Sequence, residues 1–122
     1  MKVAVVILNY NGEEHLRRFL PSVVENSCGA NVVVADNGST DDSLEWLGQT
    51  YPDVRTILLD KNYGFAGGYN RALKQVDSEY VVLLNSDVEV TEGWWQPLVE
   101  LLDTMKDVAA VAPKLRSVEH RD

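Results

Sequence analysis

Two carboxylates, Asp87 and Glu89, stand two residues apart directly after a short apolar run. If the backbone stays extended there, both side chains point to the same side. Proteins hold Mg²⁺ with one or two carboxylates together with the phosphate oxygens of a substrate. The pair therefore predicts a divalent-metal site, for Mg²⁺ or Mn²⁺, that a diphosphate completes. The alternative is a solvated acidic turn.

Two further polar clusters could bind a nucleotide base. Asp36 follows a second apolar run, and its carboxylate could accept a hydrogen bond from the ring N–H of a uracil- or thymine-like base. It could equally cap the helix that follows. Tyr10 offers an aromatic face for stacking, with the amides of Asn9 and Asn11 beside it for the edge of the base. The alternative for Tyr10 is packing against the next helix.

A fourth cluster, residues 62–70, is rich in asparagine and glycine. Its glycines let the backbone approach a ligand closely and adopt positive φ, and they are Gly64, Gly67 and Gly68. Their spacing matches neither the dinucleotide-binding motif nor the P-loop. A flexible surface loop is the alternative. Arg71 and Lys74 follow on a predicted helix and could face phosphate, although exposed charges on helices are usually solvated.

Each cluster follows a run that is typical of a buried strand. Residues 3–8 are continuously apolar, as in a central parallel strand covered on both faces. Further strands are predicted at 31–35, 54–59, 80–84 and 108–112, and helices at 13–24, 41–47, 69–76 and 93–105. This alternation predicts an α/β sandwich with right-handed crossovers. The clusters would then meet at the carboxyl edge of one sheet, where open α/β sheets bind ligands.

Local signals refine the predicted helices. Pro21 lies inside the first apolar stripe and predicts a kink or a break, because it removes a backbone donor. Ser39 or Thr40 is expected to be the N-cap of the second helix. Pro97 is compatible with the last helix if it falls in the first turn.

Length and charge narrow the class of protein. The 122 residues fit one domain, 1–122. A formal net charge of −8 disfavours DNA or RNA as a partner, because nucleic-acid-binding surfaces are basic. No apolar run approaches the ~20 residues of a membrane span, so we expect at most peripheral membrane contact.

Together these stretches resemble family 2 glycosyltransferases of the GT-A fold, especially the bacterial rhamnosyltransferase-like branch. The matching stretches are residues 5–12, 34–41, 62–70 and 83–88. The resemblance implies a three-layer α/β/α sandwich with a mostly parallel sheet. It also implies that Asn9 and Tyr10 line the base pocket, that Asp36 bonds the base and that Asp87 holds the metal, with Glu89 where a second Asp is usual. We assign nucleotide binding to Asn9, Tyr10, Asn11, Asp36, Asn62, Gly64, Gly67, Gly68 and Asn85.

The family implies transfer of a sugar from a UDP- or dTDP-sugar to the hydroxyl of a glycan or lipid-linked acceptor, with inversion. We expect a cytoplasmic protein of cell-envelope polysaccharide synthesis, with any membrane contact at the inner face. Family members typically continue well beyond this length. We therefore expect a truncated donor-binding part whose general base lies beyond residue 122, which is inactive alone and self-associates through bared apolar surface. The alternative is a non-catalytic nucleotide-binding or assembly module with the same fold.

Overall fold

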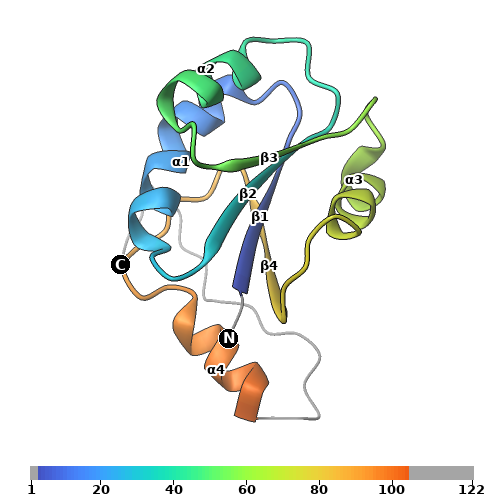
Figure 1. Cartoon of the computed structure of the whole chain (residues 1–122). Helices are drawn as coiled ribbons and strands as arrows, with labels where there is room; N and C mark the ends of the chain where they lie inside the picture. The colour runs from blue at the N-terminus through green and yellow to red at the C-terminus, as the bar shows by residue number, and fades with distance from the viewer. Residues whose placement is uncertain (1–2, 105–122) are drawn as a thin grey trace.

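The computed structural model describes residues 3–104, which form a parallel sheet with helices on both faces (Figure 1). The elements in chain order are β1 (Val3–Asn9), α1 (Glu13–Asn26), β2 (Asn31–Asp36), α2 (Ser43–Thr50), β3 (Arg55–Leu58), α3 (Gly64–Leu73), β4 (Tyr80–Asn85) and α4 (Gln96–Thr104). The strand order among these residues is β3-β2-β1-β4, and every pair is parallel. The predicted α/β sandwich is confirmed. The strand predicted at 108–112 lies outside the described residues.

Two apolar clusters, one on each face of the sheet, make the core. Leu16, Leu20 and Val23 of α1 are each 1% exposed and pack with Leu47 of α2 against one face. Burying such a side chain contributes roughly 1.5–3 kcal/mol. Tyr69 and Ala72 of α3 pack against the other face. Because β1 lies between both clusters, its residues are almost all buried, as their continuous apolar run predicts.

Helix α3 covers only part of its face of the sheet. Helix α3 packs over residues of β1, β2 and β3, while Val81 and Leu83 of β4 remain 37% and 50% exposed. Helix α4 packs near the amino end of β1, where Trp95 and Val99 contact Val3.

The break predicted at Pro21 is wrong, because α1 runs without interruption from Glu13 to Asn26. Proline removes one N–H from the helix ladder. The buried stripe lies on both sides of Pro21, from Leu16 to Val23, and packs both halves of the helix onto the sheet. Pro97 is the second residue of α4 and lies in the first turn as predicted, although the helix begins at Gln96 rather than near residue 93.

Two local predictions at the carboxyl edge are also corrected. The loop predicted at 62–70 is mostly helix, because α3 begins at Gly64 rather than at Tyr69 and ends at Leu73. Neither Ser39 nor Thr40 caps α2, which begins at Ser43 after Asp42. At the start of α3 and at the start of α2, contacts with distant segments override the local helix and capping propensities.

Candidate functional site

The strand register brings the predicted polar clusters to one edge of the sheet. Asn9 is paired with Asp36 at the ends of β1 and β2, and Leu8 is paired with Asn85 at the end of β4. The segment before α3 reaches the same edge through hydrogen bonds to Asn37. The predicted convergence of the four clusters is therefore present in the structure.

Asn9 and Asp36 form a buried polar pair at the centre of this edge. They are 0% and 2% exposed, and Asn9 Nδ2 donates to Asp36 Oδ1 at 3.0 Å. Asp36 Oδ2 accepts from the backbone N–H of Ser39 at 2.9 Å. Both carboxylate oxygens of Asp36 thus already accept a hydrogen bond from the protein. A base could donate to Asp36 only at a remaining lone pair of these oxygens.

The other amide atom of Asn9 is buried without a donor among the described residues. Oδ1 of Asn9 lies so close to Gly12 that a Cβ added there would stand 2.6 Å from it. Only glycine leaves this space free. Gly12 therefore lets α1 begin directly against the buried amide of Asn9.

A second group of contacts joins the segment after β1 to the segment after β2. The backbone N–H of Asn11 donates to Ser39 Oγ at 2.9 Å. In return, Asn11 Oδ1 accepts from the backbone N–H groups of Thr40 at 2.7 Å and Asp41 at 3.2 Å. Asn11 adopts φ 48°, the left-handed region that asparagine tolerates better than most residues. We call this group, made of Asn11, Ser39, Thr40 and Asp41, the Asn11 interlock.

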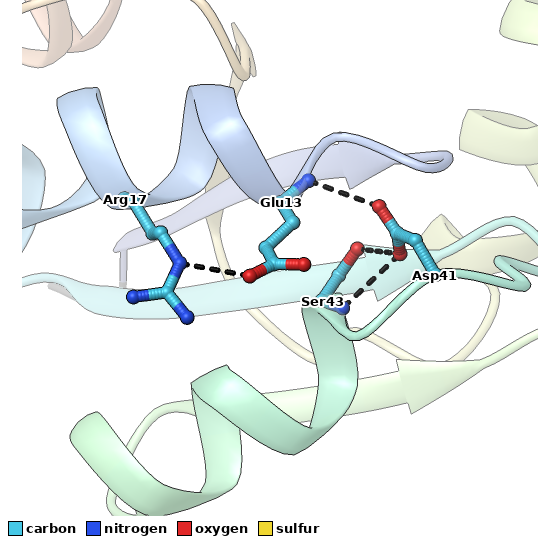
Figure 2. A network of polar contacts seen from close by, with 4 residues as sticks. All are labelled: Glu13, Arg17, Asp41 and Ser43. Atoms are coloured by element: carbon cyan, nitrogen blue, oxygen red, sulfur yellow. Dashed lines mark hydrogen bonds and ion pairs between the residues drawn. The ribbon is translucent and has the colours of Figure 1, made fainter.

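Asp41 also binds the first turns of two helices (Figure 2). Its Oδ2 accepts from the N–H of Glu13 at 3.2 Å, and its Oδ1 accepts from the N–H of Ser43 at 3.1 Å and from the Ser43 hydroxyl. Partial burial on its own would raise the pKa of Asp41, but these hydrogen bonds outweigh it and lower the pKa below its ordinary value. One carboxylate thus satisfies N-terminal donors of both α1 and α2. Glu13 pairs in turn with Arg17 at 2.8 Å.

Asn37 is a structural centre of the edge that our sequence analysis missed. It is 2% exposed, and its Nδ2 donates to Asn62 Oδ1 and to the carbonyl of Gly64, both at 3.0 Å. Its Oδ1 accepts from the N–H of Tyr63, also at 3.0 Å. The sequence shows Asn37 only as part of an Asn-Gly turn, since its partners lie 25 to 27 residues away.

The glycines at this edge allow protein segments to approach one another. Gly38 has φ +83°, and a Cβ there would lie 2.8 Å from the carbonyl carbon of Lys61. Gly68 faces the sheet, where a Cβ would lie 2.9 Å from both Asn37 Nδ2 and a methyl of Leu8. The close approach predicted for Gly68 is therefore made to protein. Gly64, with φ +76° and nothing within 4 Å of such a Cβ, borders open space.

Exposed aromatic rings and charges surround the buried centre. Tyr10 is 48% exposed, and Phe65 is 66% exposed with its ring edge-on to Tyr69 at 5.0 Å. The Arg71 guanidinium lies 3.8 Å from the centre of the Tyr63 ring, and the Tyr63 hydroxyl donates to Asp60. That hydrogen bond is the main cause of the lowered pKa of Asp60.

The predicted metal ligands follow β4 at the same edge. Asp87 and Glu89 are both exposed, and a turn at residues 86–87 replaces the extended backbone on which their common orientation depended. Within residues 3–104, no group of three or more His, Cys, Asp or Glu side chains could hold a metal ion. Two accessible carboxylates nevertheless fit Mg²⁺ or Mn²⁺, which take their other ligands from phosphate oxygens and water.

Two further observations concern the surface. A cavity of about 430 Å³ opens at the opposite, amino-terminal edge, beside residues such as Val24 and Asp77, and no predicted site residue lines it. No helix within residues 3–104 is long and apolar enough to cross a membrane.

Comparison with known proteins finds relatives that match most of this chain. An N-acetylglucosaminyl-diphospho-decaprenol L-rhamnosyltransferase of Mycobacterium tuberculosis is 29% identical over 124 residues, which cover 92% of this chain and 40% of that protein. A teichoic acid poly(glycerol phosphate) polymerase of Staphylococcus epidermidis is 31% identical over 94 residues, covering 73% of this chain and 13% of that one. The chain thus spans less than half the length of these relatives.

Solved structures show the same fold. S. aureus TarS in complex with UDP-GlcNAc matches with a TM-score of 0.71 and 28% identity, covering 85% of this chain and 32% of that one. A mannosyltransferase from Pyrobaculum calidifontis in complex with GDP-Man and Mn²⁺ matches with a TM-score of 0.71 and 25% identity, covering 83% and 32%. The family model described as Glycosyl transferase family 2 matches residues 4–121. The chain belongs to glycosyl transferase family 2.

Proposed function

We propose that the carboxyl edge binds a nucleotide-diphosphate sugar, and that the protein transfers this sugar to an acceptor hydroxyl with inversion at the anomeric carbon. The observation that carries the proposal is the convergence of four polar segments, through strand register and the contacts of Asn37, at one edge of a family 2 fold. Open α/β sheets bind ligands at this edge. Relatives with the same fold have been solved with UDP-GlcNAc and with GDP-Man.

The base side of the proposed site lies between β1 and β2. The exposed ring of Tyr10 would stack on the base, since stacking on tyrosine tolerates different bases. Asn9 and Asp36 lie beside this position, and their bonds to the protein pre-orient them before a nucleotide arrives, while the side-chain oxygen of Asn11 accepts from protein N–H groups. Such pre-organisation reduces the entropic cost of binding.

The sugar-diphosphate side lies towards α3 and the turn after β4. Asn62, Gly64 and Gly67 border it on one side, with Asn85 on the other. Asp87 and Glu89 would hold Mg²⁺ or Mn²⁺ there. When bound, such a cation would neutralise charge on the diphosphate leaving group.

Isothermal titration of the chain with UDP, dTDP and GDP, in Mn²⁺ or in EDTA, tests the proposal. We expect at least one nucleotide to bind roughly tenfold or more tightly with Mn²⁺, a difference of about 1.4 kcal/mol. Absence of binding at millimolar nucleotide would refute a donor site. Binding that is indifferent to metal would instead favour the alternative, a nucleotide-binding module without transfer chemistry.

Asp87→Ala tests the assignment of the metal ligand. We expect it to abolish the Mn²⁺-dependent part of nucleotide binding and to leave the urea unfolding curve unchanged, because Asp87 is exposed. Asp53→Ala removes the same charge from an exposed acid at the opposite edge and serves as the matched control. Equal affinities of Asp87→Ala and Asp53→Ala in Mn²⁺ would contradict the assignment.

A further inference from the structure

The backbone around Tyr10 is fixed on both sides while its ring is left exposed. Asn9, before it, donates from its side chain to Asp36 and Ser39, at 3.0 and 3.3 Å. Asn11, after it, belongs to the Asn11 interlock. Tyr10 itself is 48% exposed at the carboxyl edge. A large aromatic group on a rigid backbone loses little freedom when it binds a ligand.

Asn11 adopts the conformation that this arrangement requires. It is the one residue other than glycine with positive φ in the described part of the chain, at 48°. A non-glycine residue persists in this region when its surroundings over-determine it, and such residues cluster at binding sites. Here the surroundings are visible: Asn11 donates to Ser39 Oγ and accepts from the N–H groups of Thr40 and Asp41.

We propose that Asn11 and Ser39 are positioning residues that hold the Tyr10 ring in place for the base of the nucleotide. They act through the backbone of Tyr10, from which the ring projects. Ser39 Oγ accepts from both neighbours of Tyr10 in the chain, at Asn9 Nδ2 and Asn11 N. This inference rests on the proposed nucleotide site and adds to it the residues that set the geometry of its base side.

Variants at position 11 separate the acceptor from the backbone conformation. Asn11→Gly keeps positive φ accessible but removes the side-chain oxygen. Asn11→Asp keeps an acceptor oxygen and tolerates the same φ, so it is the conservative variant that should restore function. Hydrogen exchange of the chain without ligand gives a first readout. We expect the amides of Thr40 and Asp41 to exchange faster in Asn11→Gly and at the parent rate in Asn11→Asp.

A double-mutant cycle with Tyr10→Ala gives the decisive readout. In the parent background we expect Asn11→Gly to weaken UDP binding in Mn²⁺ by roughly fivefold to tenfold, within the range that base stacking contributes. In the Tyr10→Ala background the same substitution should weaken it by less than about twofold, because no ring remains to position. The nucleotide that binds the parent most tightly replaces UDP if UDP is not that ligand.

Two results would overturn the inference. Asn11→Gly could bind nucleotide as tightly as the parent, or it could weaken binding by the same factor with and without the Tyr10 ring. Equal factors would show that Asn11 supports the fold in general and does not act through Tyr10. A parent chain that binds none of the nucleotides would instead refute the proposed function, and the inference would fall with it.

Discussion

Replacement of Gly38 by alanine measures how closely the turn after β2 approaches the segment before α3. The residue has φ +83°, which costs a non-glycine residue about 1–2 kcal/mol. The added Cβ would also stand 2.8 and 2.9 Å from the carbonyl carbon and Cα of Lys61. Carbon atoms normally pack about 3.5–4.0 Å apart, and a backbone cannot rotate away as a side chain can. Overpacking of this kind costs roughly 1–3 kcal/mol, so we expect a total loss of about 2–5 kcal/mol.

Two other glycines provide matched controls for this substitution. Gly64 also has positive φ, at +76°, but nothing lies within 4 Å of its added Cβ, so Gly64→Ala isolates the conformational cost of about 1–2 kcal/mol. Gly48 lies within α2 with open space around it, and Gly48→Ala should stabilise the chain by about 0.5–1 kcal/mol. The stiffening of the unfolded chain is common to all three variants and cancels in their differences.

Urea unfolding of the three variants and the parent gives the free energies of unfolding. The expected order of stability is Gly48→Ala, parent, Gly64→Ala and Gly38→Ala. The difference between the last two reports the contact of the added Cβ with the backbone of Lys61 and Asn62. If Gly38→Ala and Gly64→Ala have the same free energy of unfolding, the close approach of the two segments is not rigid. If Gly38→Ala is as stable as the parent, the account of this turn is wrong.

Two further predictions concern the polar contacts of the edge. The pKa of Asp41 is lowered in the folded chain, so its contribution is present above the unfolded value of 3.8 and is lost as pH falls through the folded value. The parent should therefore exceed Asp41→Asn in stability at pH 7, by about 0.5–1 kcal/mol because the group is largely exposed, and the difference should shrink as pH falls below 3.8 and through the folded pKa of Asp41; a gap that stays constant with pH would contradict this. Asn37→Ala removes three side-chain hydrogen bonds at a buried position and should cost about 2–4 kcal/mol in urea unfolding. Asn70→Ala, at an exposed position of α3, should change stability by less than about 0.5 kcal/mol, and an equal loss in the two variants would refute the role of Asn37.

The strands and their common edge could be predicted from the sequence because their signals are local. The strands β1, β2 and β4 are built on short apolar runs, and β1 is continuously apolar up to Asn9 because both of its faces are covered. The polar residues that end these runs, such as Asn9 and Asp36, then had to meet, since parallel strands share a carboxyl edge. Pro97 was placed in the first turn of α4 by a different local signal, the tolerance of proline where the helix needs no N–H donor.

The start of α3 could not be predicted from local signals, because three of the residues in 62–70 are glycines, which disfavour helix. The helix forms there because Gly68 packs directly onto Leu8 and Asn37, a contact that a larger residue would prevent. The caps were missed for a similar reason. Ser39 Oγ accepts from the backbone N–H of Asn11, 28 residues away in the chain. Asp41 instead accepts from N–H groups in the first turns of α1 and α2.

The polar residues of the edge divide into two kinds, and the division changes how their substitutions should be interpreted. Asn9, Asp36 and Asn37 are at most 2% exposed and bonded to the protein, so their loss would impair folding and binding together. Tyr10 and Asp87 are exposed, so their loss should impair binding alone. Weaker nucleotide binding after substitution of Asp36 is therefore weak evidence that Asp36 bonds the base. Weaker binding after substitution of Tyr10, without loss of stability, is strong evidence for stacking. Substitutions of the exposed residues therefore test the proposed function without disturbing the fold.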